Sequence, residues 1–225
     1  MSETKPLYLL AGGNFGNTRS MLPLLKRALG ECGDKPHVAY IGTASGDNVI
    51  FFSMMRSLLK EAGAAKTYLV KLAKNNIDLS AAQQALERAD AIFISGGEVD
   101  DGMRWLEFHG LAGFLRELYE RGKLFIGLSA GSIMMGAHWA RWEDPKDDLT
   151  AELFDCLGFV PTTLDTHAED EDWKELKTAL RLQGSGAIGY GIPKGGMAVA
   201  DSAGSLSSEI PLIKFANNSG TVQRE

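Results

Sequence analysis

The serine with the clearest chemical context in this 225-residue chain is Ser129. It stands in Gly127-Leu128-Ser129-Ala130-Gly131, after an apolar segment and before a stretch with helical spacing. Glycines two residues before and after a serine permit a strand-to-helix turn too tight for larger side chains, and this turn exposes the hydroxyl. We therefore predict a nucleophile elbow with the Ser129 backbone in an unfavourable conformation. The alternative is a glycine-rich helix start that Ser129 merely caps.

A nucleophilic serine needs a base, and the chain has four histidines. His37 precedes a predicted strand, at the sheet edge opposite the carboxyl ends where active sites form. His138 lies further along the helix expected after Ser129, roughly 13 Å away at about 1.5 Å per residue. His109 is expected to be solvated near the end of a surface helix. His167 ends a predicted strand, so it is the candidate base.

The first half of the chain alternates short apolar segments with stretches of helical spacing. Strands are predicted at 7–11, 38–41, 67–70, 91–95 and 124–127. Helices are predicted at 18–29, 49–62 and 80–88, with a further helical stretch that ends near Arg121. This alternation is typical of an α/β fold with a mostly parallel central sheet and helices on both faces.

The last third has a different pattern, with Pro and Gly turns between short strands. After an acidic stretch at 143–148 we predict a strand at 162–166 and a helix at 170–182. Antiparallel hairpin strands are predicted at 186–192, 196–201 and 205–215, followed by a frayed polar tail at 217–225. The length and the absence of a linker predict a single domain, 1–225.

Composition excludes several classes of function. The formal net charge is −6 and we find no basic stripe, which argues against nucleic-acid binding. No apolar run is long enough to span a bilayer and no export signal is present, so we expect no membrane association and a cytoplasmic location. Cys32 and Cys156 are expected to be free thiols. We expect no cofactor and no metal, because the histidines lack paired spacing; a homodimer remains open.

Four segments together resemble the peptidase E family, the S51 serine peptidases. They are the elbow at 125–131, Ile-Ser-Gly-Gly at 94–97, Leu-Asp-Thr-His at 164–167 and Gly-Ile-Pro-Lys-Gly-Gly at 191–196. The likeness spans most of the chain and implies a fold like that of class I glutamine amidotransferases. It also implies that Ser129 is the nucleophile, that His167 is the base, and that the backbone N–H groups of Gly97 and Ala130 form the oxyanion hole.

The resemblance fails at the third member of the triad. The family places a glutamate where this chain has Lys194. A lysine cannot accept the imidazole N–H or stabilise an imidazolium. Glu169, Asp201 and above all Asp165 are candidates for a substitute acid. Asp165 lies two residues before His167 on the same predicted strand, and would point to the same face; its alternative role is a solvated carboxylate.

Two further departures concern the oxyanion site and the substrate. Glu98 stands where the family has a glycine or an asparagine, and its charge would oppose an oxyanion unless it turns outward. After the base, the aspartyl dipeptidases of the family carry an arginine, whereas 168–173 here contains four carboxylates. If these face the pocket they would repel an acidic substrate; otherwise they form a solvated first helical turn.

The leading functional hypothesis is a serine hydrolase that cleaves small peptides or a related amide through an acyl-enzyme. The first alternative is a non-catalytic relative that has lost the triad acid and binds a small ligand or partner. The second is glutamine amidotransfer, which the fold permits. That chemistry uses a cysteine nucleophile, which this elbow lacks.

Overall fold

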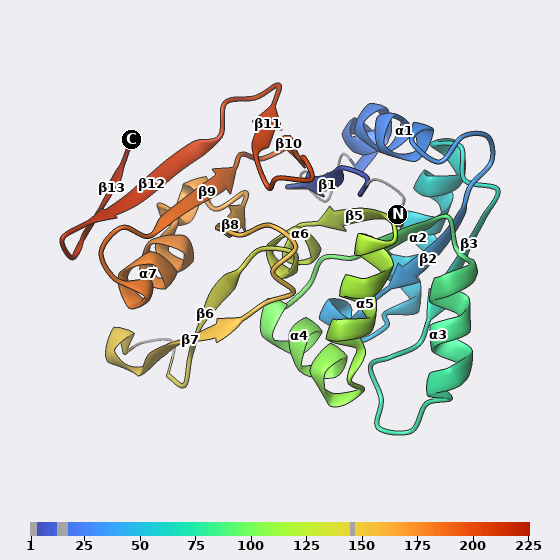
Figure 1. Ribbon diagram of the computed structural model, residues 1–225, viewed down its shortest axis with the longest axis horizontal. Coiled ribbons are helices and arrows are strands. Elements are labelled where there is room, and N and C mark those ends of the chain that lie inside the picture. The colour runs from blue at the N-terminus through green and yellow to red at the C-terminus, as the bar shows by residue number, and fades with distance from the viewer. Residues whose placement is uncertain (1–3, 13–17, 145–146) are drawn as a thin grey trace.

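The computed structural model describes residues 4–12, 18–144 and 147–225 (Figure 1). Within these ranges the largest sheet has seven strands in the order β11-β10-β1-β5-β4-β2-β3. The first five strands of the chain pair in parallel, and β10 and β11 extend the sheet antiparallel beyond β1. The bounds are β1 Leu7–Leu10, β2 His37–Ile41, β3 Lys66–Val70, β4 Ala91–Ile94, β5 Leu124–Leu128, β10 Met197–Ala200 and β11 Leu206–Ser208. The predicted mostly parallel sheet is thus confirmed.

The helices of the described residues connect these strands or cover the smaller sheets. Asn48 and Asp78 cap two of them, through side-chain oxygens that accept backbone N–H groups of the first turn. None of the helices in these ranges is long and apolar enough to cross a bilayer. The α-helices are α1 Leu22–Gly30, α2 Val49–Glu61, α3 Leu79–Arg88, α4 Val99–Phe108, α5 Leu111–Glu120, α6 Ala130–Met134 and α7 Lys174–Gln183; short 3-10 turns are η1 Thr18–Met21, η2 Thr43–Ser45, η3 Asp148–Thr150 and η4 Glu169–Glu171.

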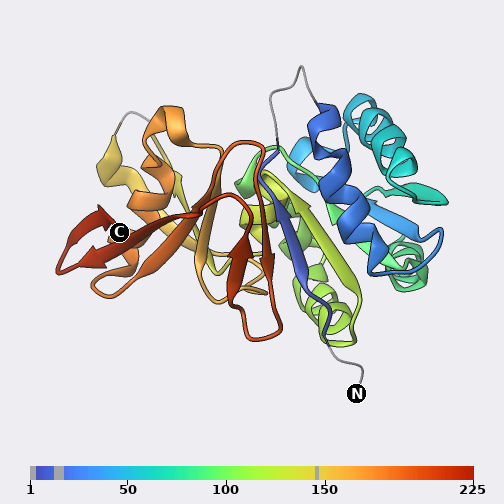
Figure 2. The same cartoon turned by 90° about the horizontal axis from the view of Figure 1, so that it is seen from above.

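The core lies on both faces of the main sheet, because successive side chains of a strand point to opposite faces. Leu9 and Phe125 join an apolar cluster with side chains of α4 and α5. Leu10 and Ile126, one position further along the same strands, join a second cluster with side chains of α1 and α2. These four side chains are fully buried. Figures 1 and 2 show helices on both sides of this sheet, as predicted.

Two smaller sheets lie beside the main sheet (Figure 1). One has the order β13-β12-β9-β8, with β8 and β9 parallel and the other pairs antiparallel. Helix α7 packs on it through a cluster that includes Trp173, Leu176 and Phe215. The other is the hairpin β6-β7. The bounds are β6 His138–Trp142, β7 Ala151–Asp155, β8 Thr163–Thr166, β9 Ile188–Ile192, β12 Ile213–Asn218 and β13 Thr221–Arg224.

The C-terminal segment differs from its prediction in two respects. Residues 217–225 are not frayed, because β12 and β13 pair as a hairpin, and the buried Asn217 side chain donates to the Leu180 carbonyl at 2.9 Å. The strand predicted at 205–215 is two strands, β11 and β12. Pro211 separates them, and it has no N–H to offer a ladder.

Two further elements were predicted incorrectly. The helix expected at 170–182 begins only at Lys174, because Asp172 and Trp173 have φ angles of 50° and 55°. The hairpin β6-β7 was missed, since the apolar residues that follow Ser129 continue the helical spacing.

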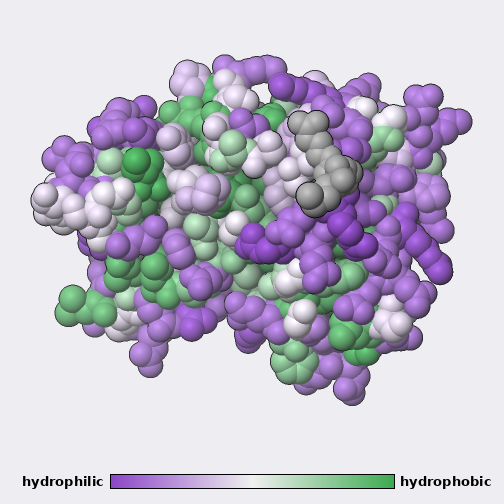
Figure 3. Space-filling model, viewed as in Figure 1, coloured by the Kyte–Doolittle hydropathy of each residue, from purple (hydrophilic) through white to green (hydrophobic). Residues whose placement is uncertain are grey.

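The face drawn in Figure 3 is mostly hydrophilic, with apolar side chains in small patches.

Candidate active site

Ser129 lies at the sharp turn between β5 and α6. Its φ of 52° and ψ of −120° lie outside the regions that residues other than glycine favour, so the predicted strained conformation is confirmed. The Ser129 N–H donates to the Leu10 carbonyl at 2.8 Å, which ties the turn to the end of β1. Ser129 makes no side-chain capping bond to the helix, so its hydroxyl is available for another partner.

The two elbow glycines leave no room for a side chain. A Cβ atom at Gly127 would lie 2.7 Å from the Ser132 Cα, and one at Gly131 would lie 2.1 Å from the Ile94 carbonyl oxygen. Both obstacles are backbone atoms, which cannot rotate away. The close approach of β4, β5 and α6 therefore requires glycine at both positions, as the sequence predicts.

His167 approaches the serine from the second sheet. Its Nε2 lies 2.7 Å from the Ser129 Oγ, within the range expected of a nucleophile and its general base. The residue follows β8 with a φ of 47°, and its N–H donates to the Ile192 carbonyl at the end of β9 at 2.9 Å. Both side chains thus lie at the carboxyl ends of strands.

The other histidines lie outside this pair. His37 begins β2, at the opposite edge of the sheet. His109 caps the end of α4 and is half-buried rather than solvated, with its Nε2 near two carbonyls. His138 is not on the helix that follows Ser129, because that helix ends at Met134. It begins β6, where its Nδ1 lies 2.9 Å from the Asp155 carboxylate.

Gly97 and Ala130 present backbone N–H groups beside the serine. Among the described residues no acceptor takes a hydrogen bond from either group. Gly97 has a φ of 143°, and a Cβ there would lie 1.9 Å from the Ala44 carbonyl oxygen. At Gly96, a Cβ would lie 3.1 Å from the Ser129 Cβ, so this loop passes close to the nucleophile. Two free donors in this position suit an oxyanion.

Asp165 is not brought to the His167 ring. It is buried, with 2% of its surface exposed, and its Oδ1 accepts the Thr166 N–H at 2.6 Å. Its Oδ2 is buried without a hydrogen-bond partner among the described residues. Asp165 and His167 line the same cavity, but no hydrogen bond between their described side chains joins them. No carboxylate in the described part of the chain hydrogen-bonds to His167.

Lys194 lies close to the Ser129–His167 pair, but as a lysine it offers no carboxylate to the histidine. It is two residues beyond Ile192, on the turn between β9 and β10, and it lines a cavity with both Ser129 and His167. Its N–H donates to the Glu169 carboxylate at 2.7 Å, so Glu169 holds this turn instead of the histidine ring.

The acidic segment 168–173 is mostly turned away from the serine. Glu169 binds the Lys194 backbone, Asp170 lies 3.9 Å from the Lys194 Nζ, and Asp172 pairs with Lys177. Glu171 alone among these four lines a cavity that includes Ser129. Of the two alternatives for this segment, carboxylates that face the pocket describe Glu171, and carboxylates turned toward solvent describe the other three.

Two of the cavities lined by described residues meet at Ser129 and His167. We call the first, of about 520 Å³, the apolar cavity. Its apolar lining includes Met21, Phe51, Met54, Met55 and Leu128. We call the second, of about 440 Å³, the acidic cavity. Its carboxylates are Glu98, Asp100, Asp165, Glu171 and Glu175. Sequence reasoning missed Glu175, and nothing in the pattern of α7 marks it.

Burial in the wall of the acidic cavity raises the pKa of Asp165 well above its usual range. The hydrogen bond from the Thr166 N–H opposes this shift, and the charge of Glu175 adds to it. The folded protein therefore keeps a proton that the unfolded chain releases. Stability contributed by this group is present below the unfolded pKa of about 3.9 and falls as pH rises toward the folded pKa.

Asp165→Asn should remove this titration while keeping the acceptor for Thr166. The melting temperature of the variant minus that of the wild type should thus increase by about 2 °C or more between pH 4.5 and pH 8. Melting curves at several pH values measure this difference. Glu120→Gln, at an exposed carboxylate of α5, is the control; a pH-independent difference for Asp165→Asn would contradict the expectation.

Comparison with known proteins identifies the family of this α/β chain. The sequence profile of peptidase family S51 matches residues 7–203, which include both Ser129 and His167. The chain therefore belongs to peptidase family S51.

Individual relatives are distant. The peptidase E of Shewanella amazonensis is 33% identical over 88 residues, which cover 39% of this chain and 37% of that protein. That of Shewanella denitrificans is 31% identical over 85 residues, which cover 38% and 36%. The matches thus span little more than a third of either relative. The crystal structure of a peptidase from an acI-B1 Actinobacterium superposes with a TM-score of 0.72 over 99% of this chain and 94% of the other; at 17% identity this likeness establishes the fold.

Proposed function

We propose that this chain is a serine peptidase that cleaves small peptides, or a related amide, through an acyl-enzyme at Ser129. The observation that carries the proposal is the 2.7 Å approach of the Ser129 Oγ and the His167 Nε2 at a strained elbow. Strain of this kind persists only where the surrounding structure enforces it, and it is typical of active sites. Membership of a peptidase family supports the same conclusion.

The chemistry follows from the positions of these groups. The Ser129 Oγ attacks the carbonyl carbon while the His167 Nε2 takes its proton. The negative charge that develops on the substrate oxygen is stabilised by the N–H groups of Gly97 and Ala130. The carbon–nitrogen bond then breaks as His167 returns the proton to the leaving amine. Water, deprotonated by His167, attacks the ester, and the acid leaves as Ser129 is reprotonated.

A panel of dipeptides, tripeptides and amino-acid amides tests the proposal. The wild-type protein should release free amine from at least one member, and Ser129→Ala should reduce the rate by about 10³-fold or more. Ser57→Ala is the matched control, because Ser57 is an exposed serine of α2 outside the cavities that meet at Ser129. Equal rates for wild type and Ser129→Ala would overturn the proposal.

A second candidate is a ligand-binding relative without turnover. The observation that favours it is the lack of a carboxylate on the His167 ring among the described residues, since the imidazole then has no orienting partner. Thermal stabilisation by amides, combined with no hydrolysis anywhere in the panel, would favour this candidate.

A further inference from the structure

The acidic cavity has a strongly negative wall next to the Ser129–His167 pair. Four of its five carboxylates come from separate elements: Glu98 precedes α4, Asp165 lies in β8, Glu171 lies in η4 and Glu175 in the first turn of α7. None of these four takes part in an ion pair with another described residue. No cation therefore balances the charge that these carboxylates carry when they are ionised.

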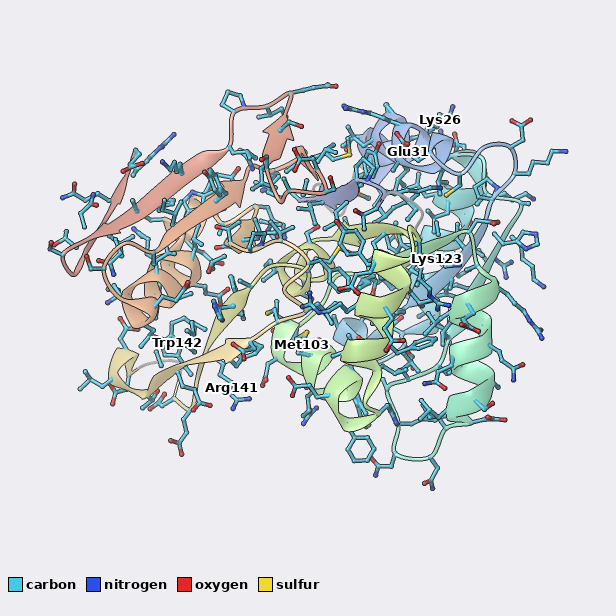
Figure 4. The ribbon with its side chains drawn as sticks, in the orientation of Figure 1. Lys26, Glu31, Met103, Lys123, Arg141 and Trp142 are labelled. Atoms are coloured by element: carbon cyan, nitrogen blue, oxygen red, sulfur yellow. The ribbon has the colours of Figure 1, made fainter. Side chains whose placement is uncertain are left out.

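The basic residues nearby are already paired. Arg141 also lines the cavity, but its guanidinium binds Asp100 at 3.1 Å and Glu152 as well. Lys174, next to Glu175 on α7, lies 2.8 Å from the Asp148 carboxylate and over the ring of Trp142. Arg141 and Trp142, both labelled in Figure 4, come from β6. Neither cation is therefore free to pair with the four carboxylates named above.

Asp165 supplies an independent sign of a missing partner. Its side chain is almost fully buried in the wall of this cavity, and its Oδ2 accepts no hydrogen bond from any described residue. A buried carboxylate oxygen without a partner is costly, and in native structures it calls for an explanation such as a bound group. A polar group bound in the cavity would satisfy it, and a cation there would favour the ionised form of the carboxyl group.

We infer that the acidic cavity binds a basic side chain of the substrate, a guanidinium or an ammonium, beside the bond that Ser129 attacks. The word substrate here rests on the proposed function. A cavity of about 440 Å³ exceeds what a bare ammonium fills. The indole rings of Trp139 and Trp142 offer apolar surface for the methylenes of a long basic side chain. No three His, Cys, Asp or Glu side chains of the described residues are arranged to hold a metal ion, which favours an organic cation.

The same charges discriminate between substrates. A substrate carboxylate in this cavity would face uncompensated negative charge and would be repelled. The preference should therefore be for basic over acidic side chains. It is the opposite of the aspartyl preference that the resemblance to some members of the family would imply.

Protonation of Glu175 makes this binding pH-dependent. Burial raises its pKa to about 7, with further contributions from Glu171 and Glu98 and an opposing one from Lys174. A bound cation favours the ionised form, so affinity should increase as pH rises from about 6 to about 8. The charged and titratable groups around Glu175 are Glu98, Asp100, Arg141, Asp165, His167, Glu171 and Lys174.

Binding to the Ser129→Ala protein tests the inference without requiring turnover. Isothermal titration should give a Kd for N-acetyl-argininamide about tenfold lower than for its neutral analogue, N-acetyl-citrullinamide. Glu175→Gln, and separately Asp165→Asn, should each reduce this ratio by about threefold or more, whereas Glu120→Gln should not change it. Alaninamide and N-acetylalaninamide form the second pair, because only alaninamide carries an α-ammonium.

Equal affinities within the arginine pair would overturn the inference, as would a ratio that neither cavity substitution changes. A preference confined to alaninamide would also overturn it, because the cation bound would then be the α-ammonium. If the cation binds but the wild-type protein hydrolyses nothing, the proposed function fails and the inference stands as a ligand site. If neutral and arginine amides are hydrolysed equally, the inference fails and the proposed function stands.

Discussion

Lys194→Glu should raise kcat for amide hydrolysis by at least about tenfold, toward the roughly 10⁴-fold that a well-placed triad acid is worth. Lys194 lies on the turn after β9, and His167 follows the parallel neighbour β8, so the two side chains leave adjacent strand ends. We expect a carboxylate there to accept the His167 ring N–H. It would also stabilise the imidazolium that forms as Ser129 is acylated.

Lys194→Gln separates this effect from the mere loss of a positive charge. It removes the Lys194 cation without adding a carboxylate, so its kcat should stay within about threefold of the wild-type value. Stopped-flow or discontinuous assays on the best substrate of the panel measure both variants. No gain with glutamate would mean that this turn does not reach His167, and the imidazole would then work without a carboxylate partner.

Gly131→Ala should lower the free energy of unfolding by about 3 kcal/mol or more, and Gly131→Val should leave little folded protein. A Cβ at this position would meet the Ile94 carbonyl oxygen at 2.1 Å and its carbon at 2.6 Å. Relief requires α6 to move away from β4, which would also displace Ser129 and remove activity.

Gly113→Ala is the matched control for this substitution. Gly113 lies in α5, where a Cβ would have no atom within 4 Å. Alanine there should stabilise the protein by about 0.5–1 kcal/mol, because glycine lowers helix stability. Denaturant unfolding of both variants measures the difference, and a Gly131→Ala protein as stable as wild type would show that the elbow is not tight.

The elbow could be predicted because it depends on local sequence. Tight packing at Gly127 and Gly131 has a direct signature in residue type, and Ser129 lies between them. The sequence favours His167 as the base because it ends a predicted strand, but β8 belongs to the second sheet, so its approach to Ser129 depends on how the two sheets pack and not on a shared edge. The helices and strands of the first half were likewise predictable from hydrophobic spacing.

The features that the sequence does not predict depend on backbone conformation and on contacts between distant segments. Apolar spacing predicts a long helix after Ser129, yet α6 ends at Met134. Beyond α6 the chain passes close to the segment before β8, since a Cβ at Gly136 would lie 3.0 Å from the Thr162 carbonyl oxygen. The positive φ of His167 has no signal in residue type. The acidic cavity gathers carboxylates from elements far apart in the chain, so its charge becomes visible only in the folded protein.

The most direct measurement of the central claim is covalent labelling by a fluorophosphonate, which reacts with activated serines. We predict one phosphonate per protein, mapped by mass spectrometry to the peptide that contains Ser129. Labelling should be absent in Ser129→Ala, and much slower in His167→Ala, because the base that activates the hydroxyl is gone. Ser57→Ala should label like the wild type. Equal labelling of wild type and Ser129→Ala, or attachment at any other residue, would contradict the assignment of Ser129 as the nucleophile.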